Sequence, residues 1–390
     1  MSTLIRPTQP SDRCFEGNEE AMRLVILTLM LIGLAVVRSS SASDQFYLKV
    51  PAGIPGDLWS YFIPKSNPLT PAKVELGRQL FFDQRLSADG SVSCSTCHDP
   101  KLGFADGKKT SEGIHGRHGT RNSPTVLNAM FSSTIFWDGR SDSLEDQAKQ
   151  PLINVDEMGN ASHEEVVKRV AAIPEYAEQF QRIFGADVTM DALAKAIAAY
   201  ERTLVSGNAP FDRFLAGERN ALSEAAQRGF NLFRGRARCT VCHNVNQSFP
   251  FFTDGNYRNT GVAANYPGFD ALVRRASAAA SNGSGAEMTA RETPGGQAEL
   301  GRFVVSGEAL DIGAFRTPSL RNVELTAPYF HDGSAATLAD VVRYYGKGGN
   351  RSANQDWELQ TLNLTENEQR DLIEFLKSLT SDDARRLAAK

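Results

Sequence analysis

The pentapeptide Cys-x-x-Cys-His occurs twice in this chain and constrains its fold more than any other feature. The first copy is Cys94-Ser-Thr-Cys97-His98 and the second is Cys239-Thr-Val-Cys242-His243, 145 positions later. This spacing is typical of c-type haem, in which both thiols bind the porphyrin and the histidine ligates the iron. Zinc would need four ligands together, and a redox disulfide needs no histidine after each pair. The sequence therefore predicts two haem c groups.

An apolar segment near the N-terminus indicates export. Met22-Arg23 precedes an apolar run, Leu24 to Val37, and small residues follow from Ser39 to Ser43. A basic start, a short apolar stretch and a small-residue exit are typical of a secretory signal peptide, whereas a spanning helix needs about 20 apolar residues. We predict that residues 1–43 comprise an upstream extension and a signal peptide, that translation begins at Met22 and that the protein is periplasmic. The alternative is an uncleaved membrane anchor.

The charge balance argues against one class of partner. The formal net charge is −4 and no block of basic residues occurs. Nucleic-acid binding relies on clustered basic charge, so no nucleic-acid partner is expected. The chain after the leader is long enough for two domains of ordinary size. Its Ala/Ser/Gly-rich run from Ala276 to Gly285 is expected to be a surface loop.

A similar segment precedes each haem motif. One runs from Pro71 to Phe81 after Thr70, and the other runs from Ser223 to Phe233. Both contain Gly-x-x-Leu-Phe, and both have a hydroxyl residue where a helix N-cap is favoured. We interpret them as an internal duplication of the cytochrome c type, in which an amphipathic helix covers the haem that its loop binds. The alternative is two unrelated amphipathic helices.

Helical patterns also dominate the rest of the chain. Capping boxes and apolar residues at helical spacing favour helices near residues 162–173, 191–204 and 365–379. Strand patterns are few and short. The predicted fold is therefore mainly α, with few short strands and two cytochrome c-type haem domains related by internal duplication. The first domain is expected to cover residues 44–210 and the second residues 211–390.

Five segments resemble the bacterial di-haem cytochrome c peroxidase/MauG family. In the first half they are Arg121-Asn122-Ser-Pro124-Thr-Val-Leu-Asn128, Phe136-Trp137-Asp138-Gly139-Arg140 and Glu157-Met158. In the second half they are Phe315-Arg316-Thr-Pro318-Ser-Leu-Arg321-Asn322 and Ala327-Pro328-Tyr-Phe-His331-Asp-Gly333. Their order and spacing match the family over roughly Ala72 to Gly349. The resemblance thus covers nearly the whole chain after the leader.

This resemblance implies roles for particular residues. Glu157 would lie over the first haem as the acid–base residue, because a carboxyl near iron can move a proton from one peroxide oxygen to the other. Trp137 would lie between the haems and relay electrons; the alternative is an ordinary core aromatic. Asn122, Thr326 and Pro328 match positions that hold a calcium ion, a cation that prefers amide and carbonyl oxygens.

The second haem site departs from the peroxidase branch of the family. His98 and His243 would be the proximal ligands, and the peroxidase branch adds a Met 14 residues after the His of its Tyr-Phe-His motif. Counting from His331 gives Tyr345 instead, which resembles the His/Tyr pair of the MauG branch. An anionic oxygen stabilises oxidised iron, whereas Met stabilises Fe(II). The alternative is that Tyr345 packs in a helix and Tyr344 or a water molecule completes the site.

A displaceable histidine is a further feature of some peroxidases of this family. Their distal His lies in a loop that ends near the Arg-Asn-x-Pro motif. The loop here, residues 113–121, differs by one residue in internal spacing and contains His115 and His118. His115 matches better, and either histidine could instead face solvent. If His115 ligates the first iron, loop movement must precede peroxide binding.

Three functions follow as hypotheses. The first is an exported peroxidase that reduces hydrogen peroxide at the haem held by Cys94, Cys97 and His98, with electrons from a small c-type cytochrome or cupredoxin. The second is a MauG-type oxidase that modifies residues of a partner protein; Tyr345 favours it. The third is a plain electron-transfer cytochrome, which Glu157 disfavours. The resemblance leaves a homodimer open.

Overall fold

The computed structural model describes residues 48–283 and 297–389. The leader predicted in residues 1–43 lies outside the described residues. Within the two described ranges, no helix is both long and apolar enough to cross a membrane. The predicted fold class is confirmed, because helices and short 3₁₀ turns dominate and a single pair of short strands is present in these ranges.

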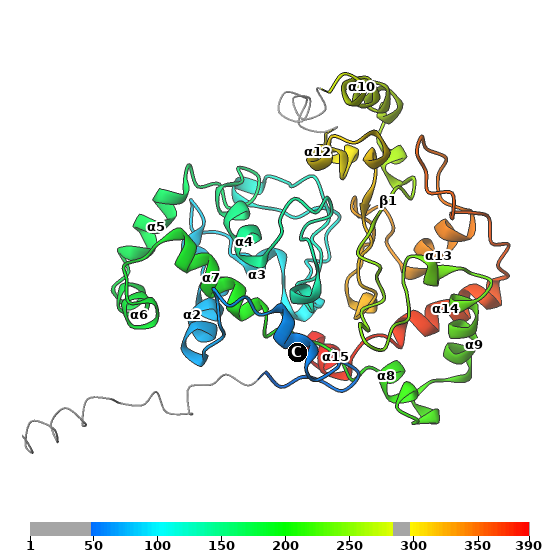
Figure 1. Ribbon diagram of the computed structural model, residues 1–390, viewed down its shortest axis with the longest axis horizontal. Helices are drawn as coiled ribbons and strands as arrows, with labels where there is room; N and C mark the ends of the chain where they lie inside the picture. The colour runs from blue at the N-terminus through cyan, green and yellow to red at the C-terminus, as the bar shows by residue number, and fades with distance from the viewer. Residues whose placement is uncertain (1–47, 284–296, 390) are drawn as a thin grey trace, which may run out of the picture. The chain divides into compact units, whose positions relative to one another are not determined.

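Figure 1 shows how the helices follow one another along the chain. In the first half they are α2 (Pro71–Phe82), α3 (Cys94–Cys97), α4 (Leu144–Ile153), α5 (His163–Ala171), α6 (Pro174–Phe184) and α7 (Met190–Glu201). In the second half they are α8 (Pro210–Leu215), α9 (Glu224–Arg234), α10 (Phe269–Ser281), α12 (Phe303–Ser306), α13 (Leu338–Gly346), α14 (Glu366–Lys377) and α15 (Asp382–Ala388). The strands β1 (Tyr257–Arg258) and β2 (Phe315–Arg316) form an antiparallel pair.

The helices predicted from capping boxes and apolar spacing are confirmed as α5, α7 and α14. The loop predicted from Ala276 to Gly285 was wrong in its first half, because α10 continues to Ser281. Alanine has the highest helix propensity of all residues, and the inner face of α10 is buried at Leu272 and Ala276. The small residues in this run therefore extend a helix rather than end one.

The duplicated segments before the haem motifs form equivalent helices. In α2 the Thr70 side chain accepts a hydrogen bond from Lys73 N, with Pro71 in the first turn. In α9 the Ser223 side chain accepts one from Ala226 N. Each helix packs against a later one, α2 against α7 and α9 against α14 (Figure 1). The two halves therefore share one local design.

Both helix pairs cross at a glycine that has no room for a side chain. A Cβ on Gly77 would lie 1.8 Å from Ala196 O, and one on Gly229 would lie 1.9 Å from Asp371 O. An added Cβ would overlap a backbone oxygen of the other helix. The glycine therefore allows the two helix backbones to touch at the crossing point. This explains why the glycine of the Gly-x-x-Leu-Phe repeat occurs in both segments.

Each helix pair belongs to a separate hydrophobic core. The first core takes buried residues between Leu76 and Tyr200, and the second takes buried residues between Phe211 and Leu379. A smaller cluster forms around α10 and α12, in the long segment that separates β1 from β2. The domain boundary at residue 210 stays a prediction.

We predict that Gly77→Ala and Gly229→Ala each lower the free energy of unfolding of the haem-loaded protein. Overpacking typically costs roughly 1–3 kcal/mol, although alanine alone favours a helix over glycine. Thermal and denaturant unfolding measure the change. Gly56→Ala is the matched control, since nothing lies within 4 Å of its added Cβ. Unchanged stability in both crossing variants would contradict this packing.

Candidate di-haem site

A cavity of about 840 Å³ is lined by residues of both halves. All six residues of the haem-attachment motifs line it: Cys94, Cys97, His98, Cys239, Cys242 and His243. None of these four cysteines forms a disulfide. Protein interiors rarely contain voids much larger than a water molecule, so a cavity of this size is suited to a bulky cofactor.

Both motif histidines are oriented by a backbone carbonyl. His98 Nδ1 lies 3.2 Å from Phe104 O, and His243 Nδ1 lies 2.8 Å from Phe252 O. Because a carbonyl can only accept, Nδ1 carries the proton in each ring and Nε2 is left free for a metal. Burial lowers the pKa of both histidines, which keeps them in the neutral form that ligates iron.

Phe104 and Phe252 themselves adopt matching backbone conformations. Their φ angles are 58° and 55°, in the left-handed region that residues other than glycine seldom adopt. The same unusual turn therefore presents a carbonyl to the histidine in each half. The duplication extends beyond the helices to the geometry around the predicted iron ligands.

A second stretch of the duplication leads into helices α4 and α13. Asn128 and Asn322 have φ angles of 62° and 60°, and Phe136 and Phe330 have φ angles of 69° and 70°. The members of each pair are 194 positions apart in the sequence. The N-caps of α4 and α13, Ser143 and Thr337, keep the same separation. Helix α4 is therefore the counterpart of α13.

The same separation pairs Pro151 with Tyr345, and both residues line the cavity. A phenol oxygen can ligate iron, whereas a proline ring has no ligating atom. At the position where the second half has a phenol, the first half therefore lacks an iron ligand. Sequence reasoning missed Pro151, although the constant separation of 194 positions would have revealed it.

The hydrogen bonds of the two neighbouring tyrosines distinguish them. The Tyr344 hydroxyl donates to Thr260 O at 2.8 Å and accepts from Asn350 N at 3.1 Å. The Tyr345 hydroxyl has no hydrogen-bond partner within the described residues, and burial raises its pKa. Of the two, only Tyr345 lines the cavity. The geometry favours Tyr345 over Tyr344 as a ligand, and its ligand role stays a prediction.

Glu157 lines the cavity just beyond the end of α4. Its Oε1 accepts a hydrogen bond from Asn154 Nδ2 at 2.8 Å. Burial raises the pKa of this carboxyl, and the nearby Arg140 guanidinium opposes the rise. A carboxyl with a raised pKa can hold and return a proton near neutral pH. This position is compatible with the role that the resemblance implies.

The two histidines of the loop over residues 113–121 lie apart from the residues that line the cavity. The His115 side chain is 62% exposed, with its Nδ1 3.6 Å from Asp89 Oδ2, and His118 is also exposed. Neither residue lines the cavity. The loop does touch the site, because Ile114 N donates to Glu157 O at 2.9 Å. Ligation of iron by His115 would need this loop to move and stays a prediction.

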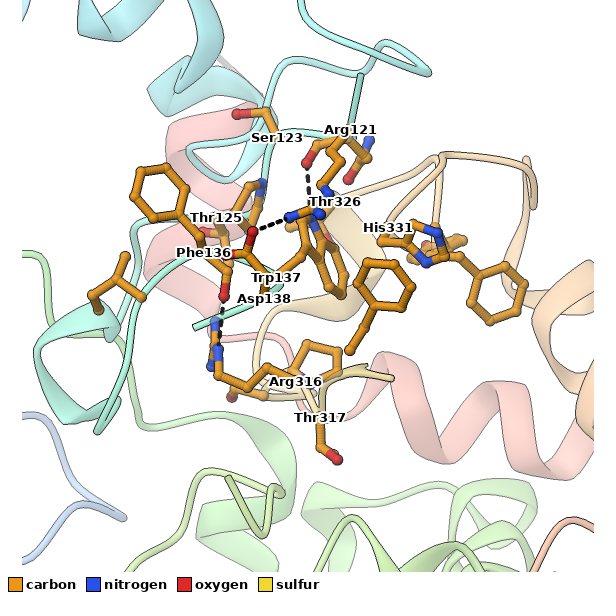
Figure 2. Close-up of a pocket in the computed structure, with 18 of the residues that line it drawn as sticks. Arg121, Ser123, Thr125, Phe136, Trp137, Asp138, Arg316, Thr317, Thr326 and His331 are labelled. Atoms are coloured by element: carbon orange, nitrogen blue, oxygen red, sulfur yellow. Dashed lines mark hydrogen bonds and ion pairs between the residues drawn. The ribbon is translucent and has the colours of Figure 1, made fainter. Parts of the chain in front are cut away.

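Trp137 lies where the two halves meet (Figure 2). Its Nε1 donates to Asn122 O at 2.8 Å, and its ring stands edge-on to His331 with the centroids 6.5 Å apart. His331 Nε2 donates to the buried Glu299 carboxylate at 2.9 Å. Trp137 also packs against the small core around α10. Both interpretations of Trp137, as a core aromatic and as a relay, are compatible with this position.

The charges in the cavity fit haem. Arg121 and Arg140 both bind Asp138, so their charges are partly neutralised. Arg316 has no carboxylate partner among the described residues and donates to Phe136 O at 3.2 Å (Figure 2). Burial lowers the pKa of Arg316. A partly buried cation without a counterion favours an anionic ligand, and the propionates of haem would meet that need.

The predicted calcium residues also lie along this cavity. Asn122, Thr326 and Pro328 all line it. Asn122 Nδ2 donates to Lys108 O at 2.9 Å, and its Oδ1 accepts no hydrogen bond from the described residues. A free amide oxygen beside backbone carbonyls is the donor type that calcium prefers.

Comparison with known proteins places the chain in a family. The sequence matches the family described as "Di-haem cytochrome c peroxidase" over residues 71–220. It is 39% identical to the methylamine utilization protein MauG of Methylorubrum extorquens over 323 residues, 82% of each chain. It is also 39% identical to the cytochrome c551 peroxidase of Nitrosomonas europaea over 310 residues, 79% of this chain and 80% of that protein.

The solved structures agree with the sequence comparisons. A MauG-like protein associated with microbial copper homeostasis is 32% identical, with a TM-score of 0.69, and the match covers 87% of this chain and 95% of that one. The chain therefore belongs to the di-haem cytochrome c peroxidase family, which includes MauG, and is a haem-dependent oxidoreductase with two haem c groups.

Proposed function

We propose that the protein is an exported, periplasmic peroxidase that reduces hydrogen peroxide to water with electrons from a small redox protein. One observation carries the proposal: the duplicated halves differ where a sixth iron ligand would come from. The first half has Pro151 at that position with Glu157 nearby, and the second half has Tyr345. Peroxide needs an open iron, whereas an electron relay does not. The first half is therefore the peroxide site and the second half is the relay.

Haem c, held by Cys94, Cys97 and His98, would supply the iron for the two-electron reduction of peroxide. The Glu157 carboxylate would take a proton from one peroxide oxygen and return it to the other, which leaves as water. The hydrogen bond from Asn154 fixes one oxygen of this carboxyl, so the other remains available. General acid–base catalysis of this kind contributes typically 10²–10⁴-fold to a rate.

The route between the two sites passes through Trp137. This indole lies beside residues of both halves, and its hydrogen bond to Asn122 O fixes the ring. The electron donor is a small c-type cytochrome or cupredoxin that docks near the second haem. Calcium bound by Asn122, Thr326 and Pro328 would hold the same region, because these residues come from both halves.

A second function has its own support. A MauG-type oxidase would use both haems to oxidise residues of a partner protein, and Tyr345 favours this function because an anionic oxygen stabilises oxidised iron. The 39% identity to a methylamine utilization protein MauG agrees with it. The two functions differ in what consumes the oxidising equivalents. A peroxidase passes them to a small redox protein, and a MauG-type oxidase passes them to a protein substrate.

We predict that Glu157→Gln lowers peroxide-dependent oxidation of a reduced small cytochrome c by roughly 10²–10⁴-fold. Because the pKa of Glu157 is raised, wild-type turnover should fall with decreasing pH above the range of an ordinary glutamate, as the base becomes protonated. This acidic limb should be absent from the variant. Stopped-flow turnover against pH measures both effects.

Glu164→Gln is the control, since Glu164 is an exposed glutamate on α5. It should leave turnover unchanged, and absorption spectra should show both haems in each variant. Full activity of Glu157→Gln would remove Glu157 from the mechanism. If peroxide oxidises the wild-type protein to a long-lived state that no small cytochrome discharges, the MauG-type function replaces the peroxidase.

We predict that Tyr345→Met raises the reduction potential of the second haem, because a thioether stabilises Fe(II) and a phenolate stabilises Fe(III). Spectroelectrochemical titration measures the potential. Tyr344→Phe is the matched control and should leave the potential unchanged, since the Tyr344 hydroxyl is bound to backbone atoms of Thr260 and Asn350. An unchanged potential and spectrum in Tyr345→Met would exclude Tyr345 as a ligand.

A further inference from the structure

Glu201, the last residue of α7, is a buried acid that the proposed mechanism does not use. It is 4% exposed and lines the cavity beside the first haem motif. Its carboxyl forms no hydrogen bond within the described residues, and Oε2 is buried without a partner. Buried polar groups are nearly always hydrogen-bonded, and an unpartnered one is costly. Such a group in a functional cavity therefore needs an explanation.

The second half shows that the fold does not require an acid at this position. The α7 residues that meet Gly77 are Ala196 and Tyr200, and the α14 residues that meet Gly229 are Asp371 and Phe375. Both pairs are separated by 175 positions in the sequence.

The same separation places Glu201 opposite Leu376, which is also buried and also lines the cavity. One half therefore has an apolar residue at this position, and the other has a carboxyl. The difference distinguishes the first haem site from the second, as the difference between Pro151 and Tyr345 does.

The surroundings of Glu201 leave its charge uncompensated. The adjacent Arg202 is bound by both oxygens of Glu145, at 2.7 and 2.8 Å. Burial raises the pKa of Glu201 to about 8; Arg202 opposes the rise, and Glu145 adds to it. The neighbouring Tyr200 phenol, whose pKa is raised to about 12 by burial and also by Glu201, stays neutral and adds no charge. The neighbouring Cys94 thiol would become a thioether after haem attachment and would not titrate.

We propose that Glu201 is a redox-linked proton acceptor for the first haem. When an electron from the donor reduces that iron from Fe(III) to Fe(II), the Glu201 carboxylate takes one proton from solvent and becomes a neutral carboxylic acid. When the iron is oxidised again, the proton is released. The physical cause is charge: the ferric haem carries one more positive charge than the ferrous haem, and a buried carboxylate is stabilised by it.

This inference needs only a haem attached at Cys94 and Cys97. It does not depend on peroxide turnover, so it stands or falls separately from the proposed function. It also predicts which way the potential changes with pH. An ionised carboxylate stabilises Fe(III), so the potential of the first haem should fall as pH rises and Glu201 loses its proton.

The test is a spectroelectrochemical titration of the first haem in the holoprotein, with a chemical reductant, at several pH values from about 6 to about 9, around the raised pKa of Glu201. Wild type is compared with Glu201→Gln, which keeps the shape of the side chain, and with Glu201→Leu, which copies Leu376. We expect the wild type and Glu201→Gln to have similar potentials at low pH. At high pH the wild-type potential should be lower.

Both variants should show a weaker dependence of the first-haem potential on pH. Glu157 lies in the same cavity and is retained in all three proteins, so its own contribution does not change. The potential of the second haem is the internal control and should keep the same pH dependence throughout. If Glu201→Leu fails to fold, Glu201→Gln alone decides the test. An equal pH dependence in wild type and Glu201→Gln would overturn the proposal.

Discussion

The structure depends on a cavity that side chains leave empty between two motifs for haem attachment. A void of about 840 Å³ would be costly in an ordinary core, because its lining atoms lose their packing partners. Two covalently attached haems would supply that packing, and their propionates would supply an anion for Arg316, which has no carboxylate partner among the described residues. Helices α7 and α14 line this cavity, through Ile197 and Glu201 in one half and Leu376 in the other, and each packs on its partner helix, α2 or α9, within a hydrophobic core.

The duplication gives both halves the same backbone arrangement, and a few side chains differ between them. The shared arrangement includes the helix crossings at Gly77 and Gly229 and the backbone carbonyls that orient His98 and His243. Pro151 and Tyr345 then differ in the ability to ligate iron. Together with Glu157, these differences are the basis on which we propose peroxide chemistry for the first half and electron relay for the second. Little rearrangement of the backbone is needed to obtain two functions from one fold.

Sequence reasoning identified the parts of the protein that local rules determine. Cap residues and apolar spacing predicted α5, α7 and α14 because these signals act within a few residues. It failed where distant residues decide the outcome. The run from Ala276 is helical because α10 buries one face. The sequence left the exposure of His115 open, because that exposure depends on a loop whose path no local pattern specifies. Pro151 was missed because its proposed effect is the lack of a ligand atom, which no motif signals.

The central claim is that the first iron has an open face and the second does not. Electron paramagnetic resonance of the diferric protein tests it directly, because an iron with one strong protein ligand is high-spin and an iron with two is low-spin. The account predicts one high-spin and one low-spin ferric signal of equal intensity, with the high-spin signal perturbed by an added small ligand such as cyanide. Two low-spin signals would contradict it, since the first iron would then have a second protein ligand such as His115.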